Sequence, residues 1–325
     1  MEGNQSDEHN SQRLMCEKID NQDQLSTLLS KARELLVSEK HFKDYEQAAE
    51  LLKQALLMAQ ETSNKGVEAK ICGELAELFF LMDSYDTSLC YGQKCLTLSK
   101  EADRKDLEAL AYSCVGSAKS KLGDLRGGLE CHKKSLDANS TTGDQRQKWK
   151  CLHNLGTAFT DLGDNANATK YFKESLAVAT EMGDKVAIAE SHGGLGVVFY
   201  KTRQYSESIS HNERHLALAK EAGKKRSQAK ACGNLGNVFL SKGDYTKAFE
   251  RYREQREIYK EIGDRSSEGN ALGALGNVYH CRGRTRKAIE SYEAQLSIAN
   301  SLNDKAAQAI AIGSCLLYTS DAADE

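Results

Sequence analysis

The sequence predicts an all-α protein, an α-solenoid built from tandem helix–turn–helix units. Three observations lead to this fold class. The 325 residues include no proline, and their composition favours helix. The same residue pattern returns every 40 positions along most of the chain. Glycine followed by aspartate marks many of the breaks between apolar segments, which is typical of one helix ending and the next being capped.

Three columns of residues define the repeat. The first is an apolar residue followed by glycine, the second a small residue twelve positions later, and the third the Gly-Asp turn. Because the glycines of the first column fall within helices, we interpret them as packing positions and not as a phosphate-binding loop. The members of the three columns are Val115-Gly116, Leu155-Gly156, Leu195-Gly196, Leu235-Gly236 and Leu275-Gly276; Ala48, Ser88, Gly128, Ala168, Ser208, Ala248 and Ala288; and Gly123-Asp124, Gly143-Asp144, Gly163-Asp164, Gly183-Asp184, Gly243-Asp244 and Gly263-Asp264.

Apolar residues between the turns recur at helical spacing, as in Ala288, Ile289, Tyr292, Leu296 and Ala299. Each repeat is therefore predicted to form a first helix, A, and a second helix, B. One such pair cannot bury its own apolar face, so neighbouring pairs must stack. The predicted pairs are 25–41 with 44–61, 65–82 with 85–101, and so on every 40 residues to 285–301.

The chain divides into four predicted regions. Residues 1–24 are polar, acidic and without periodicity, so we expect a disordered arm. Residues 25–303 hold seven repeats, and 304–314 form the truncated first helix of an eighth. The apolar side chains of that helix can pack only on the seventh repeat, so we expect them to leave an uncapped apolar end; they are Ala306, Ala309, Ile310 and Ile312.

Residues 315–325 break the register of the repeat. Their sequence, "CLLYTSDAADE", resembles one reading frame of the transposase adaptor used in sequencing libraries. We therefore expect this stretch to be an adaptor-derived artefact, absent from the gene.

The repeats resemble tandem tetratricopeptide repeats, as "GNLGNVFLSKGDYTKAFERYREQREIYKEIGDRSSEGNALGALGNVYHCRGRTRKAIESYEAQLSIA" (233–299) illustrates. The common tetratricopeptide unit has about 34 residues and a terminal proline, whereas this repeat has 40 residues and no proline. The longer form is similar to the repeats of the Pins/LGN family of G-protein-signalling modulators. It is also similar to the large scaffold called tetratricopeptide repeat protein 28. The resemblance implies a right-handed solenoid whose A helices line a concave, partner-binding groove.

Composition and motifs argue against several function classes. The ten cysteines are scattered without metal-ligand spacing, which favours buried, reduced thiols. In "HNERH", His211 and His215 share a helix face, but Asn212 stands where a zinc protease needs glutamate, so we favour packing. The basic "GKKRS" (223–227) is interpreted as a solvated turn. We expect no enzyme activity, no metal, no cofactor and no small-molecule substrate.

The resemblance places the groove in six columns of helix A. These columns hold amides, which can bond both groups of a peptide backbone, and lysines, which favour acidic partners. The alternative is that such residues only solvate an exposed helix face. The predicted groove residues are Lys70, Ser113, Ser117, Lys150, His153, Asn154, Thr157, Lys230, Asn234, Asn237, Asn270, Asn277 and His280.

The sequence thus predicts a cytoplasmic scaffold or adaptor that binds an extended, acidic protein segment. By resemblance, its pathway is G-protein signalling or cell division and polarity. The alternative is the N-terminal regulatory part of a longer enzyme or signalling protein. Without residues 1–24 and 315–325 the repeats carry a net charge of +4, which is too weak to indicate nucleic-acid binding, and no apolar run suggests a membrane span.

Overall fold

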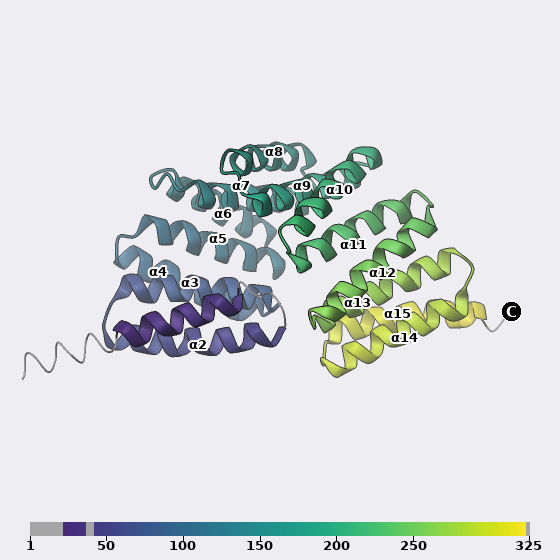
Figure 1. The fold of residues 1–325 in the computed structure, drawn as a ribbon, viewed down its shortest axis with the longest axis horizontal. Helices are drawn as coiled ribbons and strands as arrows, with labels where there is room; N and C mark the ends of the chain where they lie inside the picture. Colours follow the sequence, from purple (N-terminus) through teal and green to yellow (C-terminus); the bar gives the residue numbers. More distant parts are fainter. Residues whose placement is uncertain (1–21, 37–41, 323–325) are drawn as a thin grey trace, which may run out of the picture. The chain divides into compact units, whose positions relative to one another are not determined.

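The computed structural model describes residues 22–36 and 42–322, and side chains only to Cys315. Residues 22–36 are helical, and the remaining described chain forms antiparallel helix pairs joined by short turns (Figure 1). The helices are α2 (Phe42–Glu61), α3 (Lys65–Leu81), α4 (Tyr85–Glu101), α5 (Lys105–Lys121), α6 (Leu125–Asn139), α7 (Gln145–Asp161), α8 (Asn165–Glu181), α9 (Lys185–Lys201), α10 (Tyr205–Glu221), α11 (Lys225–Ser241), α12 (Tyr245–Glu261), α13 (Arg265–Cys281), α14 (Thr285–Ser301) and α15 (Lys305–Ala322).

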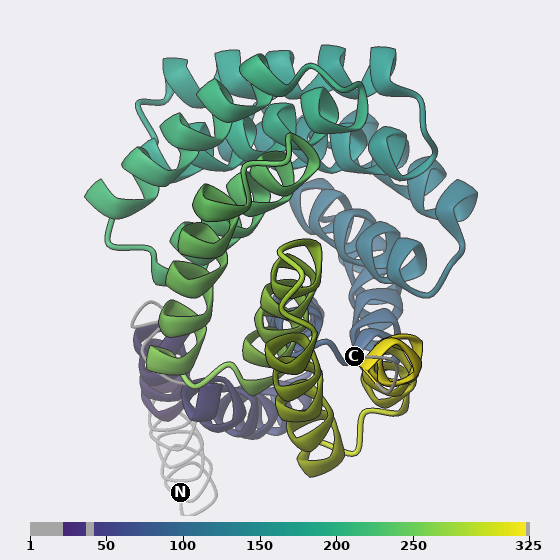
Figure 2. The same cartoon turned by 90° about the vertical axis from the view of Figure 1, so that its right-hand side faces the viewer.

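The chain forms two compact units, which divide within α7 between Asn154 and Leu155. In each unit a B helix packs against its own A helix and against the A helix of the next repeat, as α4 does with α3 and α5. The A helices also contact one another, α3 with α5 in the first unit and α9 with α11 in the second. Figure 2 shows the same helix pairs after a turn of 90° about the vertical axis. The predicted all-α repeat fold is confirmed.

The mid-helix glycines are packing positions, as predicted. A Cβ on Gly236 would lie 2.6 Å from the ring of Tyr252, and one on Gly276 would lie 2.5 Å from the ring of Tyr292. In each case the ring belongs to the B helix of the same repeat, sixteen residues later in the sequence. Glycine is required because any larger residue would push the two helices apart.

The small column marks the second close approach within each pair. All its alanines and serines are fully buried, as Ala48, Ala168 and Ser208 illustrate. The two serines add a hydrogen bond: Ser88 donates to the carbonyl of Ala76, and Ser208 donates to that of Gly196, both at 2.7 Å. A hydroxyl thus satisfies a carbonyl of the neighbouring helix without adding much volume.

The turns follow the predicted pattern. Gly123, Gly163, Gly243 and Gly283 have positive φ angles, the left-handed conformation that ends a helix. Aspartate then caps the next helix in most repeats, as where Asp264 accepts from the backbone N–H of Ser267.

Two details differ from the sequence prediction. Residues 22–24, expected in the arm, are helical; residues 1–21 of the predicted arm and 37–41 of the predicted first helix lie outside the described residues. The helix α15 continues past Ser314 as far as Ala322, the last described residue. The origin of residues 315–325 stays a prediction. Across the described residues, no helix is long and apolar enough to cross a membrane.

Candidate functional site

In the first unit, two predicted groove residues bond to each other. The amide of Asn154 on α7 donates to the Ser113 hydroxyl on α5 over 2.7 Å, and Ser113 is buried. Both lie on A helices of successive repeats, 41 positions apart. This pair holds neighbouring A helices together, which commits one donor of Asn154 to the fold.

Lys150 pairs with Glu77 on α3 at 2.7 Å. Partial burial opposes its charge, but the Glu77 carboxylate outweighs that effect and raises the pKa of Lys150. The charge of this predicted groove lysine is therefore largely balanced from within the chain. Lys70, in contrast, is exposed, Ser117 is half-buried, and the half-buried ring of His153 packs against Trp149.

In the second unit, Asn237 and Asn277 occupy equivalent positions of α11 and α13 and are exposed. Tyr252 donates its hydroxyl to the Oδ1 atom of Asn237 over 2.6 Å, and Tyr292 donates to that of Asn277 over 2.8 Å. Both tyrosine rings are buried against the packing glycines. Because the tyrosine hydroxyl occupies the Oδ1 atom, the NH₂ group of each amide stays available to a ligand.

The remaining groove residues of this unit vary in their surroundings. Asn234 donates to the Oδ1 atom of buried Asn212 over 3.1 Å, so it is partly engaged in the fold. Lys230 and Asn270 are exposed at equivalent positions, Thr157 is exposed, and His280 is half-buried. Among the predicted groove residues of the second unit, the exposed ones are therefore Thr157, Lys230, Asn237, Asn270 and Asn277.

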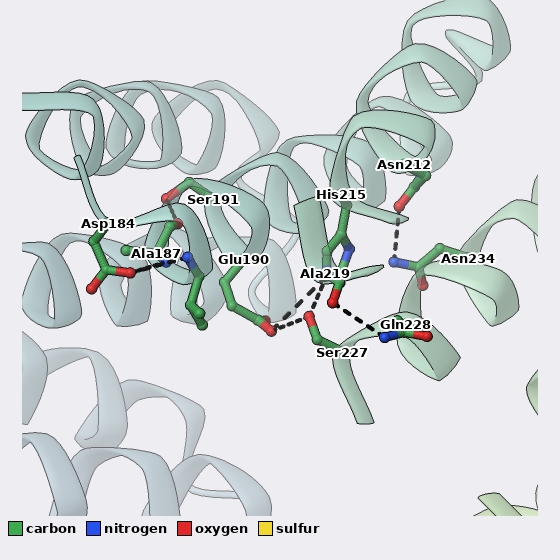
Figure 3. A network of polar contacts seen from close by, with 11 residues as sticks. Asp184, Ala187, Glu190, Ser191, Asn212, His215, Ala219, Ser227, Gln228 and Asn234 are labelled. Carbon is green, nitrogen blue, oxygen red and sulfur yellow. Dashed lines mark hydrogen bonds and ion pairs between the residues drawn. The ribbon is translucent and has the colours of Figure 1, made fainter. Parts of the chain in front are cut away.

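A buried polar network surrounds His215, which the sequence set aside as a packing residue. Its Nε2 atom lies 2.8 Å from the Ser227 hydroxyl, which in turn donates to Glu190 over 2.7 Å (Figure 3). Because Ser227 gives its proton to Glu190, the imidazole must donate through Nε2. A hydrolytic triad needs the reverse order, with histidine accepting the serine proton. This constellation therefore stabilises the contact between α9, α10 and α11.

The other histidine of "HNERH" has a different partner. His211 and His192 approach to 2.8 Å between their Nδ1 atoms, and His211 stacks on Phe199. Burial, together with the neighbouring His211, lowers the pKa of His192 to about 4, which keeps the ring neutral. His211 and His215 thus diverge to separate contacts, which agrees with the packing interpretation.

Sequence reasoning did not single out Tyr252, Tyr292, Glu190 or Ser227 as polar partners. The two tyrosines could have been found, because each lies fifteen residues after a groove asparagine in successive repeats. Glu190 carries no such signal, since lysine stands at its position in the neighbouring repeats; Ser227 recurs only as Ser267, which lacks an equivalent histidine partner because Gln255 replaces His215 there. In the described part of the chain, no three His, Cys, Asp or Glu side chains converge as a metal site.

Comparisons with known proteins place the chain in a family. The model of the Tetratricopeptide repeat family matches residues 107–181, 151–221 and 227–301, together more than half of the sequence. The chain belongs to the tetratricopeptide repeat family. None of the curated proteins compared with it matches.

Solved structures share the fold at low sequence identity. The apo form of RapI is 14% identical, with a TM-score of 0.62 over 86% of this chain and 98% of that one. Aspartyl phosphate phosphatase F from Bacillus subtilis is 15% identical, with a TM-score of 0.60 over 92% and 81%. A signal-transduction ATPase with a tetratricopeptide repeat sensor, from Pyrococcus horikoshii, is 16% identical, with a TM-score of 0.58 over 89% and 44%. At these identities the likeness concerns the fold alone.

Proposed function

We propose that this protein is a non-catalytic scaffold that binds an extended, acidic segment of a partner protein. The segment lies along the A helices and is held mainly through its backbone. One observation supports this most strongly: Asn237 and Asn277 are exposed at equivalent positions, and a buried tyrosine holds each amide oxygen. The two amides therefore offer N–H donors one repeat apart.

An extended peptide presents carbonyl oxygens along its length, and amide N–H groups are suited to bind them without reading side chains. Exposed Lys230 lies on the same helix as Asn237 and adds a positive charge that favours acidic residues. Asn270 of α13 offers a further amide at the position equivalent to Lys230. Amides that bind the peptide backbone and a lysine that attracts acidic side chains together suit an extended, acidic partner segment.

The finer assignment to G-protein signalling or to cell division and polarity rests on the resemblance of the 40-residue repeat to the Pins/LGN family. A cytoplasmic location belongs to the same proposal. The absence of enzymatic activity is likewise proposed, on the ground that the buried Ser227, His215 and Glu190 have the proton order of a triad reversed.

The test begins with a display selection of unstructured peptides on the wild-type protein. The affinity of a selected peptide is then measured for wild type and for Asn237→Ala with Asn277→Ala. We expect the double variant to lose at least tenfold in affinity at unchanged helicity, because two backbone bonds are removed. Asn300→Ala is the matched control, since Asn300 is an exposed asparagine on the B helix α14. Equal affinity in all three proteins would refute the groove.

The second candidate is a regulatory or sensor region of a longer protein. The repeats of this chain match 44% of the Pyrococcus horikoshii ATPase, in which a tetratricopeptide repeat sensor accompanies other domains. The full-length transcript distinguishes the two candidates: an encoded catalytic domain favours the second, and repeats alone favour the scaffold.

A further inference from the structure

The turns that join helix A to helix B in the last three repeats lie beside one another in the second unit. The Tyr200 hydroxyl at the end of α9 lies 3.0 Å from the Ser241 hydroxyl at the end of α11. The Arg282 guanidinium, after α13, lies 3.5 Å from the Thr246 hydroxyl on α12. These contacts bring segments 199–207, 239–247 and 279–287 to one edge.

That edge is rich in basic residues. Its three segments contain only two acidic residues, Glu207 and Asp244. We call the basic set the basic edge; its members are Lys201, Arg203, Lys242, Lys247, Arg282, Arg284, Arg286 and Lys287.

The excess of positive charge is particular to these three turns. The corresponding segments of the three earlier repeats, 79–87, 119–127 and 159–167, hold five acidic and three basic residues. At the opposite end of the helices in the second unit, basic residues are paired with acids. There Lys185 pairs with Glu221, Lys225 with Glu261 and Arg226 with Asp264. A general basic character of the repeat therefore does not explain the edge.

Half of the basic edge forms no ion pair among the described residues, although Asp244 lies close enough to Lys242 to interact with it electrostatically. Arg203, Lys242, Arg284 and Lys287 are exposed, and none forms an ion pair within the described part of the chain. Lys247 and Arg286 have only local pairs on their own side of the helix, with Asp244 at 3.4 Å and Glu290 at 3.5 Å. Unbalanced charges of one sign, concentrated at one edge, raise the local concentration of anionic partners.

Arg203 adds a second observation. Its φ angle is +61°, whereas the equivalent positions 163, 243 and 283 are glycines with positive φ. A residue with a side chain is strained in this left-handed conformation. The turn thus holds an exposed arginine where most equivalent turns hold glycine; Asp83, at a further equivalent position, also adopts positive φ.

The chemistry of the edge selects the kind of partner. Four of its eight members are arginines, whose planar guanidinium groups bind carboxylates and phosphates in a bidentate manner. None of the exposed large hydrophobic side chains of the described chain belongs to the three segments, which leaves nothing to insert into a lipid bilayer. With packed helices about 10 Å apart, three adjacent turns span roughly 20 Å, the length of about six extended residues.

We propose that the basic edge is a second binding surface, which takes an extended protein segment rich in carboxylate or phosphate groups. It is separate from the groove asparagines, which lie within helices α11 and α13. Long-range attraction to the edge speeds encounter, and the arginines fix the anionic groups.

The test measures binding of fluorescent peptides about a dozen residues long to the full chain by anisotropy. The probes are polyglutamate, an alternating phosphoserine peptide and an uncharged serine peptide; anionic phosphatidylserine vesicles are assayed by flotation. The edge variant carries Arg203→Glu, Lys242→Glu, Arg284→Glu and Lys287→Glu. The matched control carries Lys133→Glu, Lys148→Glu, Lys173→Glu and Lys260→Glu, four dispersed, exposed lysines without an ion pair in the described part.

The two variants change the net charge equally, so only the position of the charges differs. We expect the edge variant to lose at least tenfold in affinity for an anionic peptide and the control less than about threefold. Wild-type binding should weaken between about 0.05 M and about 0.3 M salt, because screening shortens the reach of exposed charges. The preferred anionic peptide identifies the source of the anionic groups.

Equal losses in both variants, no loss in the edge variant, or no binding of either anionic peptide by wild type would each overturn the proposal. Retention on vesicles in preference to peptides would overturn the assignment to a protein segment. The single variant Arg203→Gly, which relieves the strained turn, guards against misfolding and should still lower affinity about twofold. Normal peptide binding by the Asn237→Ala, Asn277→Ala protein separates this surface from the groove.

Discussion

Single glycines set how closely the two helices of each repeat approach. Gly116, Gly156, Gly196, Gly236 and Gly276 each face the side chain sixteen residues later, which is histidine, phenylalanine, asparagine, tyrosine and tyrosine in turn. The glycine is constant in these five repeats while its partner varies. The sequence predicted the glycine; the partner's chemistry differs from repeat to repeat and gives each pair its own polar contacts.

Gly276→Ala should lower the free energy of unfolding by about 1–3 kcal/mol, because the new Cβ meets the Tyr292 ring at 2.5 Å. Gly313→Ala is the control, since nothing lies within 4 Å of a Cβ there. That change should stabilise α15 by about 0.5–1 kcal/mol through helix propensity. Urea denaturation of both variants measures the contrast, and a stable Gly276→Ala protein would contradict the packing argument.

Buried histidines make stability depend on acid. Burial lowers the pKa of His132 to about 4, below the ordinary value of 6.5, and the side chain is only 3% exposed. The unfolded chain therefore binds the proton first. Stability is complete above about pH 6.5 and is lost as the pH falls towards 4, by at most about 3 kcal/mol.

His132→Phe should remove this part of the pH dependence. Phe172 occupies the equivalent position of the next repeat, against Gly156, so the helix pair accommodates such a ring. The measurement is the urea midpoint of both proteins between pH 7 and pH 5. If the two proteins lose stability in parallel, His132 does not titrate as its burial requires.

The turn is the element that fixes the length of each helix. A residue with positive φ ends the helix, and an aspartate often caps the next one. Glycine is the usual residue with positive φ, but Asp83, Asp103 and Arg203 adopt the same conformation in their turns. The backbone conformation is thus conserved across the repeats even where the residue type is not, because helix packing on both sides imposes it.

Arg203→Gly should raise the free energy of unfolding by about 1 kcal/mol, because the left-handed conformation at φ +61° costs glycine nothing. Gly243→Ala is the reverse change at the equivalent turn, where φ is +77°, and should cost about the same amount. Thermal unfolding of the two proteins checks both signs. A destabilised Arg203→Gly protein would show that the arginine side chain supports the fold itself.

At the scale of the whole molecule, each repeat depends on its neighbours for burial. The helix α15 packs on α14, and the apolar residues expected to pack there leave the expected apolar end exposed. Ala306, Ala309, Ile310 and Ile312 are exposed, whereas Ala311 is fully buried. The apolar residues run almost continuously through this helix, so composition could not reveal the buried face; only the register of the repeat, which places Ala311 with buried Ala271, does so.

Backbone amides of α15 should exchange with deuterium faster than those of α13. Ile310 is 62% exposed and Ile312 44% exposed, so the free energy that holds this helix on α14 is small. Residues 265–281 are covered by α12 and α14 and serve as the internal reference. Exchange monitored by mass spectrometry measures the difference, and equal protection of both helices would contradict it.

The sequence by itself determined the repeat length, the helix pairs and the turns. These features follow from local signals: apolar periodicity, glycine at strained backbone positions and aspartate at helix starts. It also assigned the mid-helix glycines to close helix contacts, because they recur every 40 residues. His215 was assigned to packing because the equivalent positions of other repeats hold no histidine.

Only the tertiary structure decided which polar groups meet. It joined Asn154 to Ser113 across two A helices and linked His215 through Ser227 to Glu190. It also placed the Tyr252 hydroxyl against the Oδ1 atom of Asn237, which leaves the NH₂ group of Asn237 available. The NH₂ group of Asn154, in contrast, donates to Ser113 within the fold. These contacts depend on the rotation of each side chain and on the stacking of repeats, which are set by packing between helices and not by any one helix.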